Sequence, residues 1–289
     1  MHPRMRIMGL FLLLGGMFAI IGWVLGGYFA GGNWILGAAF FLVLAGIFNV
    51  ISYFFSSKIV LMSYRARILK EDELPWLHDM VSGIAKKAGV PKPKVALVPT
   101  KTPNAFATGR NPDNAVVAVT EGIMDVLSRT ELEGVLAHEM AHVKDRDILV
   151  MTVAATMAGA IAFMARIFWF NALIGGRGGR GGGNALILLV VAITAPMAAM
   201  LIQLAISRSR EYKADKVGSL TINKPLALAS ALQKLERANK KKPIDRGNPA
   251  SSSLFIVNPF RGSGFASIFS THPPTKERIS RLKELAKEI

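Results

Sequence analysis

An uncharged stretch near the N-terminus constrains the fold more than any other feature of this sequence. No charged residue occurs from Ile7 to Ser57. A stretch of this length exceeds what a soluble core requires, and it suffices for two helices across a hydrocarbon layer about 30 Å thick. The segment 31–33, Gly-Gly-Asn, provides a turn between them. We therefore expect membrane-spanning helices over 7–29 and 34–56, and the run is too long for a cleavable signal peptide.

Two further apolar runs, 148–170 and 185–206, are separated by a glycine-rich segment over 171–184. That segment lacks the flanking strand and the Lys-Ser/Thr pair of a phosphate-binding loop, so it indicates a flexible linker. Both runs are long enough to cross a bilayer. The alternative is a hairpin packed on the membrane side of the rest of the chain, and the sequence leaves both arrangements open.

The charge balance also favours a membrane protein. The chain has 289 residues and a net charge of +16, but it has no interleaved aromatic and basic motif, so nucleic acid is not an expected partner. The positive-inside rule explains the excess better and predicts that both termini face the cytoplasm. The basic residues that flank the first, second and fourth runs are Arg4, Arg6, Lys58, Arg65, Arg67, Arg208, Arg210 and Lys213. The absence of cysteine excludes disulfides and cysteine-based zinc sites.

The segment His138-Glu139-Met-Ala-His142 is an H-E-x-x-H motif. Positions i and i+4 lie one turn apart on the same helix face, so both imidazoles can reach one zinc ion at about 2.0–2.1 Å. Glu139 can then hold a metal-bound water instead of the metal. Thr130 and Glu133 fit a capping box that would begin this helix. The alternative is a surface helix whose two histidines cap or pair other groups.

A helix and three short strands precede this motif. Helical periodicity extends over 73–88 and ends at Gly89, whereas the segments 94–98, 105–108 and 115–119 are typical of strands separated by turns. We expect a small sheet whose edge accepts an extended peptide above the metal. Lys58–Lys70 is interpreted as a basic segment near lipid headgroups or as a solvated basic face.

A catalytic zinc usually has three protein ligands and a water. The metzincin pattern would place a third histidine where Ile148 stands, so a carboxylate becomes the first choice. Glu211 and Asp215 are four residues apart on a predicted helix. Glu211 can bind zinc while Asp215 accepts the free ring N–H of a ligand histidine, and Arg210 can hold a carboxylate of this cluster. A solvated i, i+4 charge pair is the alternative.

Three other polar residues have two interpretations each. His272 precedes Pro273-Pro274 and a basic last helix over 277–289, and it either donates a hydrogen bond to a tetrahedral oxyanion or simply begins that helix. Asn104 is an amide on the substrate edge or a turn residue. His78 is a surface or packed histidine.

Four motifs together resemble the HtpX family of membrane zinc metalloproteases, bacterial relatives of the CAAX prenyl proteases. They are His138-Glu139-Met-Ala-His142, Glu211-Tyr-Lys-Ala-Asp215, the segment 104–109 (Asn-Ala-Phe-Ala-Thr-Gly) and the segment 272–278 (His-Pro-Pro-Thr-Lys-Glu-Arg). The resemblance implies a gluzincin-like protease domain at the cytoplasmic side of a bacterial inner membrane, with a role in quality control of membrane proteins. It also implies His138, His142 and Glu211 as zinc ligands and Glu139 as catalytic base.

We therefore predict a mainly helical α+β protein, multi-pass in the membrane, with a zincin protease domain that carries a small sheet. The expected parts are a two-helix anchor over 1–57, a first protease half over 58–147, two apolar helices over 148–206 and a second protease half over 207–289. The expected function is zinc-dependent cleavage of misfolded or damaged membrane proteins or other unfolded polypeptides. The alternatives are a non-catalytic metal-binding scaffold and a CAAX-type protease of prenylated peptides.

Overall fold

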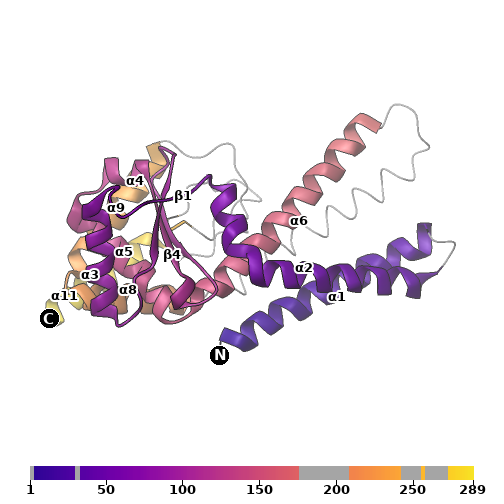
Figure 1. Ribbon diagram of the computed structural model, residues 1–289, viewed down its shortest axis with the longest axis horizontal. Coiled ribbons are helices and arrows are strands. Elements are labelled where there is room, and N and C mark those ends of the chain that lie inside the picture. Colours follow the sequence, from indigo (N-terminus) through magenta and orange to yellow (C-terminus); the bar gives the residue numbers. More distant parts are fainter. Residues whose placement is uncertain (1–2, 30–32, 176–207, 242–254, 258–272) are drawn as a thin grey trace.

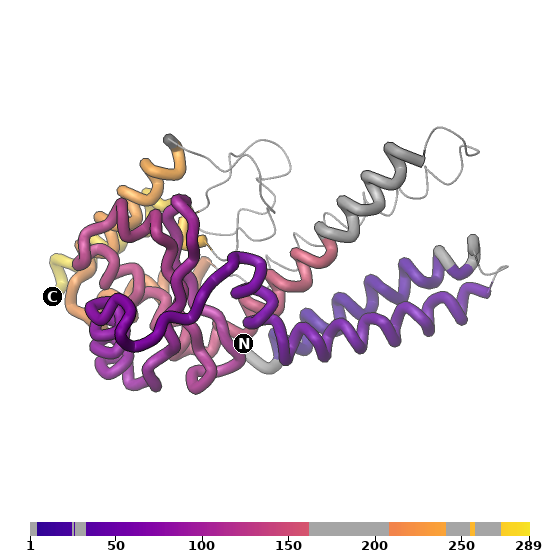
Figure 2. Tube along the Cα trace, turned by 45° about the horizontal axis from the view of Figure 1, so that its top comes forward, coloured from indigo at the N-terminus to yellow at the C-terminus, as the bar shows by residue number. Residues whose placement is uncertain are grey.

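Two long antiparallel helices form a rod that projects from the rest of the protein (Figure 1, Figure 2). The computed structural model describes residues 3–29, 33–175, 208–241, 255–257 and 273–289. Within them, α1 (Pro3–Phe29) and α2 (Trp34–Ser63) pack closely, because a Cβ atom at Gly37 would overlap the carbonyl oxygen of Gly22. Both helices cover the predicted spans, but α1 begins four residues before the expected start at 7, and α2 continues seven residues beyond the expected end at 56.

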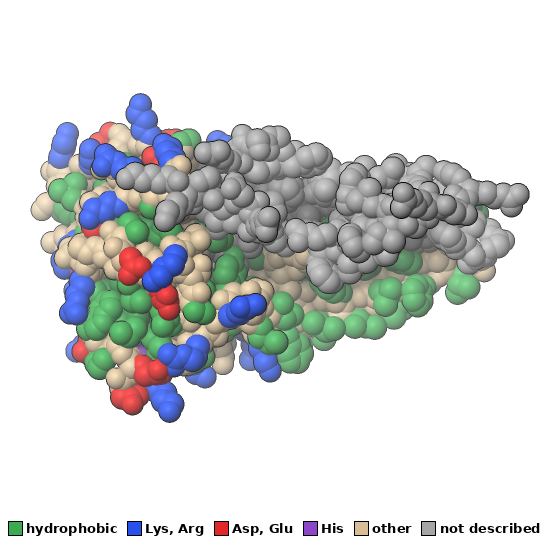
Figure 3. Space-filling model, turned by 90° about the horizontal axis from the view of Figure 1, so that it is seen from above, with side chains coloured by type: hydrophobic (Ala, Val, Ile, Leu, Met, Phe, Trp, Pro, Cys, Tyr) green, Lys and Arg blue, Asp and Glu red, His purple; other side chains and the backbone are tan. Residues whose placement is uncertain are grey.

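The rod has the composition of a membrane anchor. Met5–Val24 and Trp34–Ser63 each reach a mean hydropathy of 2.3, and they are the candidate spans within the described residues. Most of their large apolar side chains are exposed. In Figure 3 the drawn part of the rod is mainly hydrophobic, while Lys, Arg, Asp and Glu gather on the body.

The third apolar run is helical. The helix α6 (Asp147–Gly175) covers the predicted run 148–170 and continues into the glycine-rich segment. As far as Ile161, its buried side chains pack mainly against apolar residues of α1 and α2. The fourth run, 185–206, and most of the glycine-rich segment lie outside the described residues.

The body is built on a four-stranded mixed sheet with the order β1-β2-β4-β3. β2 (Lys94–Val98) and β4 (Val116–Thr120) are parallel, and β3 (Ala105–Thr108) is antiparallel to β4 at one edge. The three predicted strands are thus present, with β4 one residue later than expected. β1 (Arg67–Ile68) pairs with β2, whereas the sequence indicated only a basic segment there.

Both faces of the sheet are covered, which explains why its strands are almost continuously apolar. Val117 and Val119 belong to the main core beneath the helices of the body. Ala118 and Phe106 face a second cluster, which includes Val60 from the end of α2. The end of α2 therefore enters the body directly beside the sheet.

The H-E-x-x-H motif lies on α5 (Arg129–Lys144). Three helices pack against α5, namely α3 (Pro75–Ala88), α8 (Arg208–Ile222) and α9 (Pro225–Lys241). The body also contains α4 (Glu121–Val126), α11 (Thr275–Glu288) and a 3₁₀ turn at Pro112–Asn114.

The capping box of α5 differs from the prediction. Ser128 is the N-cap residue, its hydroxyl accepts the Glu131 N–H, and the Glu131 carboxylate accepts the Ser128 N–H at 2.8 Å. The sequence offers the same S/T-x-x-E spacing twice. The earlier pair is used because Glu131 is also held by Lys234 at 2.8 Å and by Ser230 at 2.7 Å, both on α9.

Two glycines bring neighbouring helices against α5. A Cβ atom at Gly218 of α8 would lie 2.6 Å from the carbonyl oxygen of Ala137 and 2.7 Å from the nitrogen of His138. At Gly134 of α5 itself, a Cβ atom would lie 2.8 Å from the nitrogen of Leu228 on α9. Side chains are therefore excluded at both contacts, and α8 reaches the backbone of the motif helix.

Candidate metal centre

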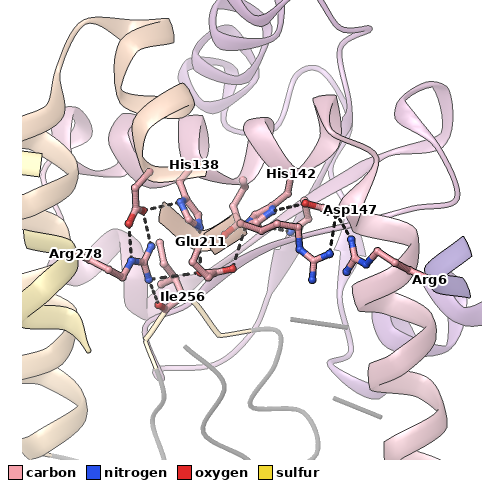
Figure 4. A network of polar contacts seen from close by, with 11 residues as sticks. Arg6, His138, His142, Asp147, Glu211, Ile256 and Arg278 are labelled. Atoms are coloured by element: carbon pink, nitrogen blue, oxygen red, sulfur yellow. Dashed lines mark hydrogen bonds and ion pairs between the residues drawn. The ribbon is translucent and has the colours of Figure 1, made fainter. Parts of the chain in front are cut away.

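The structure brings together the three residues for which a shared metal was expected. His138, His142 and Glu211 are buried, and each offers a ligand atom within 4.8 Å of the others. α5 presents both histidines on one face, and the first turns of α8 bring Glu211 opposite them (Figure 4). The close contact at Gly218 sets how far α8 lies from that face.

The distances suit a zinc ion. Two atoms bound at about 2.0–2.1 Å to one tetrahedral zinc lie about 3.4 Å apart. His142 Nε2 lies 3.4 Å from Glu211 Oε1, and His138 Nε2 lies 3.7 Å from Glu211 Oε2. His142 Nε2 is buried and has no hydrogen-bond partner among the described residues. The Nε2 atoms and the carboxylate thus converge on one position, as a His₂Glu zinc site requires.

Glu139 lies between this cluster and the edge of the sheet. Its Oε2 accepts a hydrogen bond from the Ala107 N–H of β3 at 3.0 Å. Burial raises the pKa of Glu139, although the neighbouring histidines act in the opposite direction. A carboxylate whose pKa is raised is better suited to accept and return a proton than one at its usual value.

His138 is oriented by a buried carboxylate. Its Nδ1 lies 2.9 Å from Asp215 Oδ1. Arg278 of α11 binds Asp215 through two hydrogen bonds, Nε to Oδ2 at 2.8 Å and Nη2 to Oδ1 at 2.7 Å. Burial favours the neutral form of Asp215, but Arg278 outweighs it and lowers the pKa of Asp215 to about 2. The carboxylate is therefore ionised and fixed when it faces the ring.

A carboxylate also lies near His142 on the other side, at a longer distance. The His142 Nδ1 atom lies 3.8 Å from Asp147 Oδ2, and Asp147 forms a buried ion pair of 2.6 Å with Arg6 of α1. Arg210, which we expected to hold a carboxylate of the cluster, lies 3.7 Å from Asp147. α1 thus contributes a cation, Arg6, to the surroundings of the metal cluster (Figure 4).

The carboxylates around His142 favour a positive charge at the cluster. Burial lowers the pKa of His142, but Asp147 and Glu211 outweigh it and raise this pKa to about 10. Without a metal, the ring therefore holds a proton at neutral pH. A divalent cation would take the place of that charge.

Arg278 also fixes a short segment beside the edge strand. Its Nη1 donates to the Ile256 carbonyl at 2.9 Å. The Ile256 N–H donates to the Asn104 side-chain oxygen at 3.2 Å, and Asn104 is almost fully buried just before β3. Asn104, expected on the substrate edge or in a turn, therefore anchors this segment, and a role toward substrate stays a prediction.

The sequence did not indicate that three of these residues lie around the metal cluster. Arg278 ends the segment 272–278 that carries the family resemblance, Asp147 begins α6, and Arg6 is the last charge before the uncharged stretch. All three residues can be read in the sequence, but their contacts form only through long-range packing. His272 lies outside the described residues. His78 is buried on α3, with Nδ1 3.5 Å from Glu71 Oε2.

Comparisons with known proteins agree with this geometry. The model of peptidase family M48 matches residues 71–286. The chain is 52% identical over 286 residues to the protease HtpX homolog of Thermococcus sibiricus, covering 98% of each chain. It is 56% identical over 251 residues to the protease HtpX homolog of Methanocaldococcus jannaschii, covering 86% of this chain and 88% of the relative.

Among solved structures, Ste24p of S. mikatae matches 96% of this chain and 62% of its own chain. The TM-score is 0.48 at 17% identity, which is too low to define a shared fold. The sequence relationships are much stronger than this likeness. The chain therefore belongs to peptidase family M48, as a metalloprotease with two apolar N-terminal helices.

Proposed function

We propose that this chain is a zinc-dependent endopeptidase anchored in the cytoplasmic membrane, and that it cleaves misfolded or damaged membrane proteins. The chemistry rests on one observation: the buried group His138, His142 and Glu211 lies beside a carboxylate, Glu139, that contacts the edge strand β3. A purely structural metal site has no need of such a base.

Each residue has a defined task in this proposal. His138, His142 and Glu211 hold the metal, and Asp215 and Asp147 orient the two imidazoles. When bound, zinc supplies Lewis acidity, which lowers the pKa of water and polarises a carbonyl group. Glu139 accepts the proton of the attacking water at its carboxylate and returns it to the nitrogen of the leaving amine.

The edge strand supplies a place for the substrate. Among the described residues β3 pairs with β4 on one side only, and the Ala107 N–H on its other side points to Glu139. An extended polypeptide added along this edge would place a peptide bond next to the cluster. Backbone pairing recognises an unfolded segment whatever its side chains, which suits a protease of damaged proteins.

The membrane setting rests on the rod and on the distribution of charge. α1 and α2 are apolar and outward-exposed, and basic residues flank their ends on the side of the body. By the positive-inside rule, both termini and the metal centre face the cytoplasm. Reporters fused after Lys70 and after Ile289 should both indicate cytoplasm, and an external signal at either position would reverse the orientation.

The decisive experiment compares the parent protein with Glu139→Gln. The amide cannot accept a proton, so the variant should bind zinc normally but should not cleave casein, while the parent should lose cleavage in the presence of a chelator. Zinc content is measured by elemental analysis of the purified, membrane-extracted protein. Cleavage by the variant at the parent rate would remove Glu139 from the mechanism, and zinc binding by the parent without chelator-sensitive cleavage would favour a scaffold.

A further inference from the structure

A cavity of about 710 Å³ opens where the rod meets the body. Its apolar wall comes from Ile7, Met8 and Phe11 of α1 and from Tyr53 of α2. Its polar wall comes from two segments of the body, Arg110-Asn111 and the turn 144–146 between α5 and α6. A cavity of this size accommodates an organic molecule larger than a simple ion.

Aromatic residues place this cavity at the edge of the hydrocarbon layer. At the far end of the rod, Trp23 and Trp34 pack with ring centroids 4.8 Å apart, and both are exposed. Tyr53 lies 19 residues after Trp34 on the same helix, which corresponds to about 29 Å along the axis. This length matches the hydrocarbon thickness, and Trp and Tyr prefer its two boundaries. The cavity beside Tyr53 is therefore level with the lipid headgroups.

The polar wall has an excess of positive charge. Arg110, Lys144 and Arg146 are exposed there, and neither Lys144 nor Arg146 forms an ion pair within the part of the chain that the structure describes. Asp145 is the single acidic residue of the lining, and it is paired with Lys213 at 2.6 Å. Lys144 and Arg146 are thus available to an anion that arrives from the membrane side, while the Arg110 guanidinium lies over the Phe54 ring, 5.7 Å from its centroid.

The backbone supports a role for the Arg146 side chain. Arg146 has a φ of 57°, a left-handed conformation that glycine or asparagine adopts more easily. An arginine at this position puts a cation next to the cavity in spite of that conformational preference.

We propose that this cavity binds one anionic phospholipid, with its phosphate beside Lys144 and Arg146 and its acyl chains along α1 and Tyr53. The arrangement requires both halves of the ligand: a free phosphate would leave the apolar wall uncovered, and a neutral lipid would leave the cations unpaired. The proposal rests on the membrane placement of the rod given above, but not on catalysis.

The test uses the full-length protein in nanodiscs that contain equal amounts of phosphatidylglycerol and phosphatidylcholine with the same acyl chains. Native mass spectrometry of the released protein measures which lipid stays bound. The parent should retain phosphatidylglycerol in preference by about tenfold or more, since each basic residue near an anionic lipid favours it by about fivefold. The double variant Lys144→Gln/Arg146→Gln should lose this preference.

The matched control is Lys86→Gln/Lys87→Gln. These two exposed lysines lie in the last turn of α3, in the body and away from the rod, and their replacement removes the same charge. The control should retain the parent preference. Equal retention of both lipids by the parent, or equal loss in both variants, would refute a specific site.

A competition experiment separates the lipid from its headgroup. Addition of millimolar glycerol 3-phosphate or inorganic phosphate should not displace phosphatidylglycerol, and displacement would show that the site binds free phosphate instead. These measurements need no cleavage, so a failed lipid site and a failed protease assignment give different results.

Discussion

The replacement Gly218→Ala tests whether the contact between α8 and α5 sets the metal centre. The new Cβ atom would lie 2.6 Å from the Ala137 carbonyl oxygen and 2.7 Å from its carbon. Ordinary contact begins at 3.4 Å, so α8 must move away by about 0.8 Å. The obstacle is helix backbone and cannot rotate aside. Overpacking of this kind costs about 1–3 kcal/mol of folding free energy.

The movement should also reach the metal ligand. Glu211 precedes Gly218 by two turns of α8, about 10 Å along the axis, and so moves with it. Metal-ligand distances tolerate changes of only about 0.2 Å. We therefore expect zinc affinity to fall by about 10–100-fold, the range observed when the support of a ligand is lost. A competition titration against a chromophoric chelator measures the affinity, and thermal unfolding with and without chelator measures the stability.

Two controls separate ligand displacement from general loss of stability. In Gly134→Ala the Cβ atom would lie 2.8 Å from the Leu228 nitrogen of α9, so this variant should be similarly destabilised. The clash is with α9, which carries no residue of the cluster, so the zinc affinity of Gly134→Ala should change much less. In Gly83→Ala nothing lies within 4 Å of the new atom, and a gain of up to about 1 kcal/mol is expected. If Gly218→Ala binds zinc as tightly as Gly134→Ala, the reasoning is wrong.

Three further predictions concern the surroundings of the site. Asp147→Asn removes the charge beside His142 and should weaken zinc binding by about 10–100-fold in the same titration; unchanged affinity would exclude a role for Asp147. Glu131 has its pKa lowered to about 2, because Lys234 and other hydrogen bonds outweigh burial. Its contribution is therefore complete above about pH 4.5 and is lost as the pH falls toward 2. The full difference corresponds to about 3 kcal/mol, which solvent screening at Lys234 reduces to about 1–2 kcal/mol. Glu131→Gln should accordingly be less stable than the parent at pH 7 and nearly equal to it near pH 2 in denaturant unfolding. His272→Ala should keep zinc but lower turnover by about 10²–10³ if His272 stabilises the oxyanion; loss of zinc would instead make it a ligand.

Local patterns predicted the parts of this structure that depend on local physics. The spacing of His138 and His142 defines one helix face without knowledge of any neighbour, and an uncharged stretch as long as 7–57 leaves few soluble alternatives. The three strands were recognised because their runs are short, apolar and bounded by turn residues. In each case the determining contacts are within a few residues of one another in sequence.

Such local patterns could not predict contacts between residues that are far apart in the sequence. Glu211 lies 69 residues after His142, and its spacing to Asp215 alone is equally typical of a solvated helix. Arg6 and Arg278 acquire their roles only when distant helices pack against α5. The start of α5 was misplaced for the same reason, because Lys234 on α9 helps to decide which of two equivalent capping boxes forms.

The two buried Asp–Arg pairs have a consequence for biosynthesis. One arginine, Arg6, is on α1, and the other, Arg278, is on the last described helix, α11. A partly synthesised chain can therefore present the H-E-x-x-H helix, but it has neither Glu211 nor the arginine that fixes Asp215. The surroundings of the centre are therefore complete only when both α1 and α11 are in place. A chain that stops short of α11 should therefore lack part of the centre even though its H-E-x-x-H helix is present.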